Sequence, residues 1–184
     1  MSNHSLSSKD KGIFLRALTL ISMITDDSDD ACYSICDSHD IKYIFQALNS
    51  AKMNYRIEAL NILQNITQAK APVDELKTYD IVTKSVILLE EGLEMNSEIG
   101  KIQAILSLHL IGNLGKASED FTEAFHRYGC IKSLFNSFEY DDKKVLRASV
   151  SAFARLNLIE RMLDVLDNEV SLALIFLGRT YFKL

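Results

Sequence analysis

The chain has 184 residues and a net charge of −5, with 25 acidic and 20 basic side chains. Hydrophobic residues make up 48% of it, which excludes a disordered chain, and its length is enough for one domain with a real core. The acidic balance argues against nonspecific binding to nucleic acid, which needs a basic surface. A single proline and seven glycines favour a helical fold over a turn-rich β fold.

The N-terminal residues 1–10 form a polar, serine-rich tail that lacks the apolar run of a signal peptide. The most apolar stretch, residues 99–114, includes Lys101 and His109 and is too short and too polar to span a bilayer. Three cysteines, an odd number, do not suggest a disulfide framework. We therefore expect an intracellular protein of the cytoplasm or nucleus that binds no membrane.

Four segments share an apolar residue, a polar residue and then an alanine, and each predicts a long helix. The alanines stand 42, 45 and 44 residues apart, at positions 17, 59, 104 and 148. The segments are Leu15-Arg16-Ala17-Leu18, Ile57-Glu58-Ala59-Leu60, Ile102-Gln103-Ala104-Ile105 and Leu146-Arg147-Ala148-Ser149. A period of about 40 residues in an apolar chain is typical of a helical solenoid.

A second pattern predicts a medium helix before each long one, with apolar residues at positions 0, +3, +4 and +7 on one face. The first set begins at Ile41, a weaker set at Val82, and two more at Ile131 and Ile159. Short helices are predicted before the first three sets, at residues 29–37, 73–79 and 119–128. We expect bends or caps at the joints, where the residues are Asp40, Asp80 and Gly129.

This three-helix unit resembles the armadillo repeat, in its period of about 42 residues, its bend at Gly129 and the alanine of its long helix. One copy carries the long-helix pattern of that family well, with Leu63 and Asn65 after Ala59. The resemblance implies an all-α, right-handed solenoid with about three full repeats and partial terminal ones. We expect a single domain over residues 11–184, with repeats near 11–25 (partial), 28–68, 72–115, 118–156 and 157–184 (partial).

Two clusters suggest a metal site at first, but each has a stronger structural interpretation. Cys32, Cys36 and His39 have no obvious second pair of zinc ligands, and buried cysteines commonly act as small hydrophobes. The acidic run at residues 26–30 lacks the glycine and the final glutamate of a calcium loop. Its carboxylates suit the start of a helix that Ser28 caps. We expect no metal site.

The sequence predicts no catalytic residue and no cofactor, so we do not expect an enzyme. No serine or cysteine lies in a nucleophile elbow, and the histidines form no constellation. Gly112 and Gly115 are interpreted as the end of a helix rather than as a phosphate loop. Phenylalanine and tyrosine lie mostly at helical apolar spacing, which indicates core rather than base stacking.

The polar residues of the long helices are the candidate binding residues, because the resemblance implies that these helices line a concave groove. In the armadillo family a ladder of asparagines there holds an extended peptide. The other interpretation is a plain solvated helix face. The candidates are Arg16, Asn65, Gln68, Gln103, Asn113, Arg147, Arg155 and Asn157.

We therefore expect a noncatalytic scaffold or adaptor that binds a segment of a partner protein on its concave face; the net charge favours a basic partner. Two alternatives stay open. The chain could be a chaperone cofactor or assembly adaptor that grips a folded domain. It could also be a homo-oligomeric structural element joined through the very apolar C-terminal helix predicted at residues 169–184.

Overall fold

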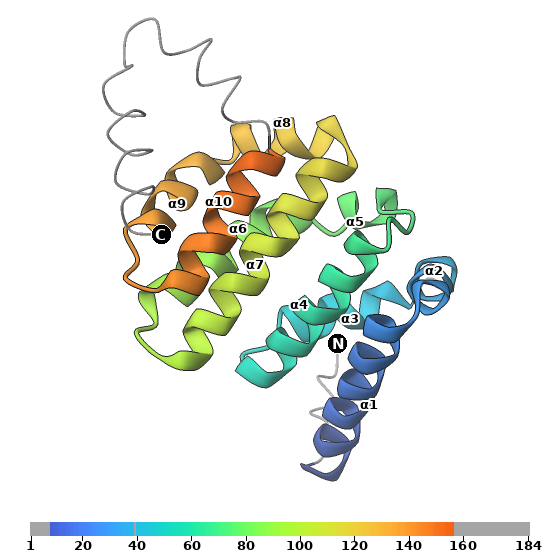
Figure 1. Cartoon of the computed structure of the whole chain (residues 1–184). Helices are drawn as coiled ribbons and strands as arrows, with labels where there is room; N and C mark the ends of the chain where they lie inside the picture. Colours follow the sequence, from blue (N-terminus) through green and yellow to red (C-terminus); the bar gives the residue numbers. More distant parts are fainter. Residues whose placement is uncertain (1–7, 39, 157–184) are drawn as a thin grey trace, which may run out of the picture. The chain divides into compact units, whose positions relative to one another are not determined.

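The computed structural model describes residues 8–38 and 40–156, and this part of the chain contains ten α-helices and no strand (Figure 1). The helices are α1 (Ser8–Asp27), α2 (Asp29–Asp37), α3 (Ile41–Leu48), α4 (Met53–Gln68), α5 (Asp74–Lys77), α6 (Ile81–Glu94), α7 (Glu98–Ala117), α8 (Glu119–Arg127), α9 (Cys130–Phe138) and α10 (Lys143–Arg155). None of the described helices is both long enough and apolar enough to cross a membrane.

The helices follow the predicted order in that two shorter helices precede each long one, although α2 (9 residues) is no shorter than α3 (8 residues) and α8 and α9 have 9 residues each. After the long helix α1, this order occurs three times: in α2, α3 and α4, in α5, α6 and α7, and in α8, α9 and α10. The prediction of three full three-helix repeats after a partial first one is confirmed. The final partial repeat, predicted at residues 157–184, lies outside the described residues.

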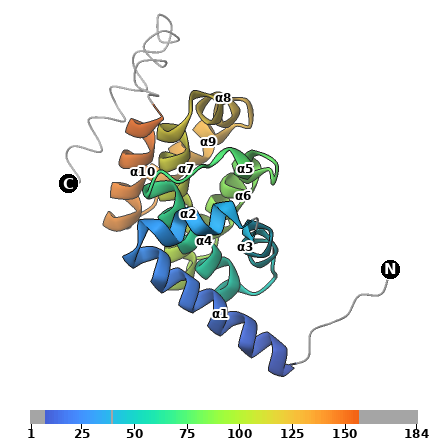
Figure 2. The same cartoon turned by 90° about the vertical axis from the view of Figure 1, so that its right-hand side faces the viewer.

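The contacts divide the chain into two compact units, Met1–Ile81 and Val82–Leu184. In the first unit α1 and α3 each pack against α4, and α2 contacts both α1 and α4. Figures 1 and 2 both show α1 running alongside α4. The stripe predicted for α3 forms part of this core, since all four of its apolar residues are buried: Ile41, Ile44, Phe45 and Leu48.

In the second unit α7 packs against α10 and α8, and α9 contacts α8 and α10 (Figure 1). Its core is built mainly from leucines and phenylalanines of these helices, together with small side chains. The fully buried residues include Leu108, Leu114, Phe121, Phe125 and Leu134.

Local sequence signals fix several helix ends as expected. The Ser28 hydroxyl accepts a hydrogen bond from the Ala31 amide at 3.3 Å and caps α2, which confirms the structural interpretation of the acidic run. Ser118 caps α8 in the same way. Gly129, between α8 and α9, has a φ of +74°, a left-handed conformation that only glycine adopts without strain.

The predicted buried face of α9 is wrong by one residue. The stripe that begins at Ile131 is partly exposed, and the buried residues are Cys130, Ser133, Leu134 and Ser137. Serines pack there because their hydroxyls find local partners: Ser137 donates to the Leu134 carbonyl, for example. The phenylalanines form a separate aromatic cluster in which Phe135 and Phe138 lie 5.9 and 5.7 Å from the Phe153 ring.

Candidate functional site

The candidate site lies on the paired long helices α7 and α10 of the second unit. The starts of the two helices are tied together. Ser97 caps α7 through a hydrogen bond from the Gly100 amide, and Asp142 caps α10 by accepting from the Lys144 and Val145 amides. The Lys101 ammonium lies 2.7 Å from Glu98 Oε1 and 3.5 Å from Asp142 Oδ2, so it connects α7 to the cap of α10.

The charge arrangement at these helix starts shifts two pKa values. The pKa of Asp142 is held below its ordinary value, chiefly by the hydrogen bond from the Val145 amide. The pKa of Lys101 is raised, first by its hydrogen bond to Glu98. Both groups therefore stay charged at neutral pH.

Two glycines allow α7 and α10 to approach closely. A Cβ on Gly112 would lie 3.0 Å from Ala152 Cα, and one on Gly115 would overlap the Leu156 side chain. The interpretation of these glycines as a helix end is wrong, because α7 continues to Ala117. Their role is steric: the absence of side chains lets the second long helix lie directly against the first.

A polar cluster joins the C-terminal halves of the two helices. Arg155 Nη1 donates a hydrogen bond to Asn113 Oδ1. Asn113 is only 8% exposed, whereas Arg155 is exposed. His109, one turn before Asn113, is half-buried, and its pKa is lowered first by burial and then by the positive charge of Arg155. The imidazole is therefore neutral at pH 7 and available as a neutral hydrogen-bonding group.

An open stripe on α7 extends from this cluster towards the start of the helix. Ile102, Leu106, His109 and Asn113 are spaced four, three and four apart and share one helix face, which is open at the first three residues and buried at Asn113. Ile102 is 47% exposed, and Leu106 and His109 are partly exposed. On α10 the exposed residues Arg147, Ala154 and Arg155 add two cations. We call these seven residues the long-helix face.

Three of the predicted binding residues belong to the long-helix face, but only Arg147 and Arg155 are exposed there, because Asn113 is buried and bonded to Arg155. Gln103 does not belong to this face, because it is fully buried and donates from Nε2 to the Leu88 carbonyl at 2.8 Å. Its side chain ties α7 to α6 and offers no surface to a partner. Asn157 lies outside the described residues.

The other three predicted residues belong to the first unit. Arg16 and Gln68 are exposed. Asn65 is half-buried, and its Nδ2 donates to the Ser22 carbonyl at 3.3 Å and to Thr25 Oγ1 at 3.1 Å. The asparagine that best fitted the armadillo pattern therefore holds α1 against α4.

Sequence reasoning did not select the two apolar members, Ile102 and Leu106. Polarity alone would predict that Ile102 is buried and that the neighbouring Gln103 is exposed. The structure shows the opposite. The signal that would have found them is the spacing to His109 and Asn113, which places all four on one face.

Cys32 and Cys36 are buried, which supports the core interpretation of these thiols. Cys32 Sγ lies 3.4 Å from the Thr25 carbonyl, to which it donates. Among the described residues no group of three histidine, cysteine or acidic side chains could hold a metal ion. His39, the third residue of that cluster, is outside the described part.

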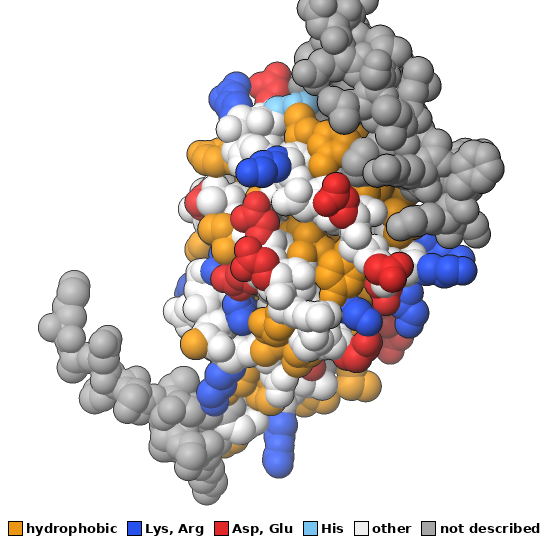
Figure 3. Space-filling model, turned by 90° about the vertical axis from the view of Figure 1, so that its left-hand side faces the viewer, with side chains coloured by type: hydrophobic (Ala, Val, Ile, Leu, Met, Phe, Trp, Pro, Cys, Tyr) orange, Lys and Arg blue, Asp and Glu red, His pale blue; other side chains and the backbone are white. Residues whose placement is uncertain are grey.

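On the face shown in Figure 3, acidic and basic side chains alternate with apolar ones, and the described residues there form no continuous basic stripe.

These helices and their arrangement define the class of protein, and comparisons with known proteins agree with it. No protein-family model matches the chain, and no curated protein matches it significantly. A designed armadillo repeat protein is similar in structure, with a TM-score of 0.67 and 15% identity; the match covers 83% of this chain and 60% of that one. The fold is thus an all-α solenoid of armadillo-like repeats.

Two engineered proteins of known structure are also similar, both at 18% identity. Their TM-scores are 0.67 and 0.65, and the matches cover 83% and 82% of this chain. They cover 36% and 59% of the engineered chains, so this chain spans less than two thirds of their length. At such identities the likeness concerns the fold alone.

Proposed function

We propose that this chain is a noncatalytic protein-binding scaffold that holds an extended segment of a partner protein on the long-helix face. The observation that carries the proposal is the open stripe of α7 beside the exposed arginines of α10. It combines apolar contact area at Ile102 and Leu106 with polar groups at His109 and Arg155. Such a combination suits a peptide backbone with alternating side chains.

The rigidity of the support favours binding. Helix caps, the Lys101 contacts and the close glycine packing fix α7 against α10 before a partner arrives. A preorganised surface loses little conformational entropy when it binds, so modest contacts give useful affinity. Binding of this kind involves no covalent reaction.

The local charge specifies the segment further. Arg147 and Arg155 are exposed, and both are donors without acceptor capacity. They favour carboxylates and main-chain carbonyls of the bound segment. We therefore propose an acidic or neutral segment, in place of the basic partner that the net charge of the whole chain favours.

The test is selection of peptides from a random displayed library on the full chain, followed by titration calorimetry with the selected peptides. Ile102→Asp and Arg147→Glu should each weaken binding about tenfold or more, because they remove an apolar contact and reverse a charge. Ile87→Asp on α6 and Lys132→Glu on α9 are matched controls at exposed positions and should leave affinity unchanged.

The other outcomes decide against the proposal. Equal binding by all four variants would place the binding surface elsewhere. Failure to select any peptide, with the chain folded, would reject an extended-segment partner and favour a folded domain as the ligand.

A further inference from the structure

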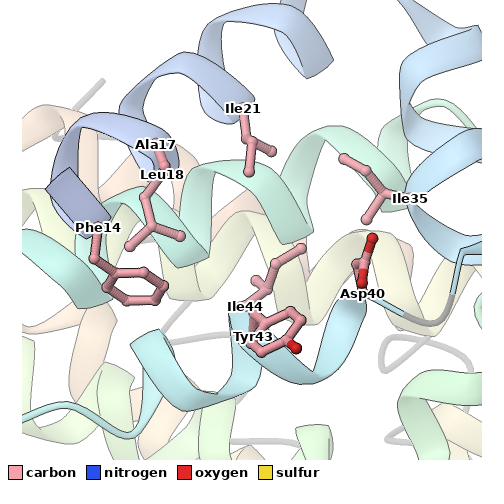
Figure 4. Close-up of a pocket in the computed structure, with 8 residues that line it drawn as sticks. All are labelled: Phe14, Ala17, Leu18, Ile21, Ile35, Asp40, Tyr43 and Ile44. Atoms are coloured by element: carbon pink, nitrogen blue, oxygen red, sulfur yellow. The ribbon is translucent and has the colours of Figure 1, made fainter. Parts of the chain in front are cut away.

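The first unit contains an apolar groove between the long helix α1 and the medium helix α3. It has a volume of about 270 Å³ (Figure 4). Its lining residues are Phe14, Ala17, Leu18 and Ile21 of α1, Ile35 of α2, Tyr43 and Ile44 of α3, and Asp40 just before α3. Pockets for drug-sized ligands measure about 300–1,000 Å³, so this groove suits a few side chains of a polypeptide better. We call it the α1–α3 groove.

The α1 wall of the groove corresponds to positions that are covered in other long helices. In α1 itself Ala17 is exposed and Ile21 is half-buried. The counterparts of Ala17, Leu18 and Ile21, 42 and 131 residues later, are at most 3% exposed: Ala59, Leu60 and Leu63 of α4, and Ala148, Ser149 and Ala152 of α10. In those repeats a medium helix packs on the long one, α3 on α4 and α9 on α10. The described residues include no medium helix ahead of α1.

The α3 wall of the groove corresponds to covered positions as well. Asp40 and Tyr43 are exposed. The counterparts of Asp40, Tyr43 and Ile44, 90 residues later in α9, are at most 1% exposed: Cys130, Ser133 and Leu134. Ser133 Oγ donates to Glu90 Oε1 of α6 at 2.6 Å, so α9 lies beside the medium helix of the preceding repeat. A medium helix thus lies between its own long helix and the next medium helix, and the α1–α3 groove is this place in the first repeat.

The groove is acidic at one end. Figure 4 shows Ile35 and Asp40 at the end opposite to Phe14. Residues 26–40 hold six aspartates, all exposed, and no lysine or arginine. With Arg16 and Lys42 included, residues 14–44 carry a net charge of −4, against −5 for the whole chain. The last turns of α1 and α2 contain no basic residue, although helix C-termini attract cations. This end therefore favours a positively charged ligand.

The direction of a medium helix brings its N-terminus to this acidic end. Only four residues join α3 to α4 and α9 to α10, so the medium and long helices of a repeat run antiparallel. A helix that lies antiparallel to α1 in the groove begins near Ile21 and Asp40 (Figure 4). The carboxylates there stabilise the positive end of its dipole and any cation beside it.

The described medium helices of a second copy cannot supply this helix, because each is packed within its own repeat: α3 on α4, α6 through the Leu88 carbonyl to α7, and α9 on α10. We propose that the α1–α3 groove binds a short amphipathic helix of a partner protein, which packs as the medium helix of the first repeat and carries lysine or arginine just before its first turn. This site is separate from the long-helix face and does not depend on it.

The test uses a synthetic, fluorescently labelled helix as the probe. The probe is stapled into helical form, with leucines at positions 0, +3, +4 and +7, glutamines elsewhere and two lysines before the first turn. Fluorescence anisotropy with the full chain should give a Kd of about 1–100 μM. A second probe with two glutamates in place of the lysines should bind about fivefold more weakly or worse, because it opposes like charges.

Two variants of the chain test the groove itself. Ala17→Phe fills the groove and Asp40→Lys reverses the charge at its acidic end, and each should weaken the lysine probe about fivefold or more. Both positions are exposed, and the Asp40 side chain makes no capping hydrogen bond, so helicity and Tm should not change. Ala117→Phe and Asp141→Lys are matched controls at exposed positions of the second unit and should leave the affinity unchanged.

Methyl NMR locates the probe without any substitution. The δ1-methyl signals of Ile21, Ile35 and Ile44 should shift when the lysine probe is added, whereas those of Ile99 and Ile102 should not. Because Ile102 belongs to the long-helix face, this measurement separates the present inference from the proposed function.

Several results would overturn the inference. A folded wild type that does not bind the lysine probe at about 1 mM has no such site. Equal affinity for the glutamate probe would reject the basic flank. Shifts at Ile102 in place of the groove isoleucines would assign the probe to the long-helix face. Sedimentation velocity covers the remaining case: a wild-type dimer that Ala17→Phe converts to a monomer would place a second copy, and not a partner helix, in the groove.

Discussion

Arg155 of α10 donates a hydrogen bond to Asn113 of α7, and after burial, which is the larger cause, its charge also lowers the pKa of His109 one turn before Asn113. One exposed arginine thus joins the two long helices and adds to the effect of burial on the neighbouring imidazole. Both effects arise because the close glycine packing brings the C-terminal halves of α7 and α10 together.

The lowered pKa of His109 predicts a pH dependence of stability. The folded chain binds this proton more weakly than the unfolded chain, whose histidine pKa is about 6.5. The stability due to neutral His109 is therefore present in full above about pH 6.5 and is lost as the pH falls through the folded pKa. The free energy of unfolding of the wild type and of His109→Gln should converge between about pH 7 and pH 5.

Two observations complete this test. Asp142, the other described group of the site with a lowered pKa, titrates below its ordinary value of 3.8 and does not affect this range. Arg155→Ala should raise the pKa of His109 in an NMR titration. A His109 pKa at or above 6.5 in the wild type would contradict the structural explanation.

Asn65→Ala should destabilise the protein by about 1–3 kcal/mol, because it removes the amide that bonds to the Ser22 carbonyl and the Thr25 hydroxyl. Chemical denaturation gives the value. Gln68→Ala, at an exposed position three residues later, is the control and should change stability by less than about 0.5 kcal/mol. If Asn65→Ala lowered the free energy of unfolding as little as Gln68→Ala does, Asn65 would not hold α1 to α4.

Gly112→Leu should destabilise the protein by about 1–3 kcal/mol or more, since even a Cβ would meet Ala152 Cα at 3.0 Å. Gly12→Leu is the matched control in α1. Nothing lies within 4 Å of a Cβ there, so the higher helix propensity should raise stability by about 0.5–1 kcal/mol. Thermal melts of both variants measure the difference, and a tolerated Gly112→Leu would show that α10 can move away from α7.

The three cysteines should react slowly with iodoacetamide while the chain is folded. Burial raises the pKa of Cys130 to about 12 and that of Cys36 to about 11, and it also raises the pKa of Cys32. Few thiolates therefore exist at pH 8, and access is blocked as well. Mass spectrometry should show rapid triple alkylation only in guanidinium. In a Ser34→Cys variant the introduced thiol is exposed on α2 and should be alkylated rapidly in the folded chain. If the native thiols were alkylated as fast as this one, their burial would be contradicted.

The functional residues were harder to predict than the helices. Asn65, Gln68 and Asn113 are polar residues of long helices, and polarity alone favours exposure for all of them. In the structure only Gln68 is exposed, because Asn65 bonds to α1 and Asn113 is covered and bonds to Arg155. Gln103 is buried completely against the Leu88 carbonyl. Each of these partners comes from another helix, so spacing along one helix does not identify them.

Sequence alone determined the order of the helices and roughly where they lie, because apolar periodicity, capping residues such as Ser28 and Ser118, and the bend at Gly129 are local properties of the chain. The 42-residue recurrence also determined the repeat class. Only the tertiary structure decided which face of a helix is covered. Ala17 and Ala59 occupy the same repeat position, yet Ala17 is exposed and Ala59 is buried, because burial depends on the helix that lies alongside.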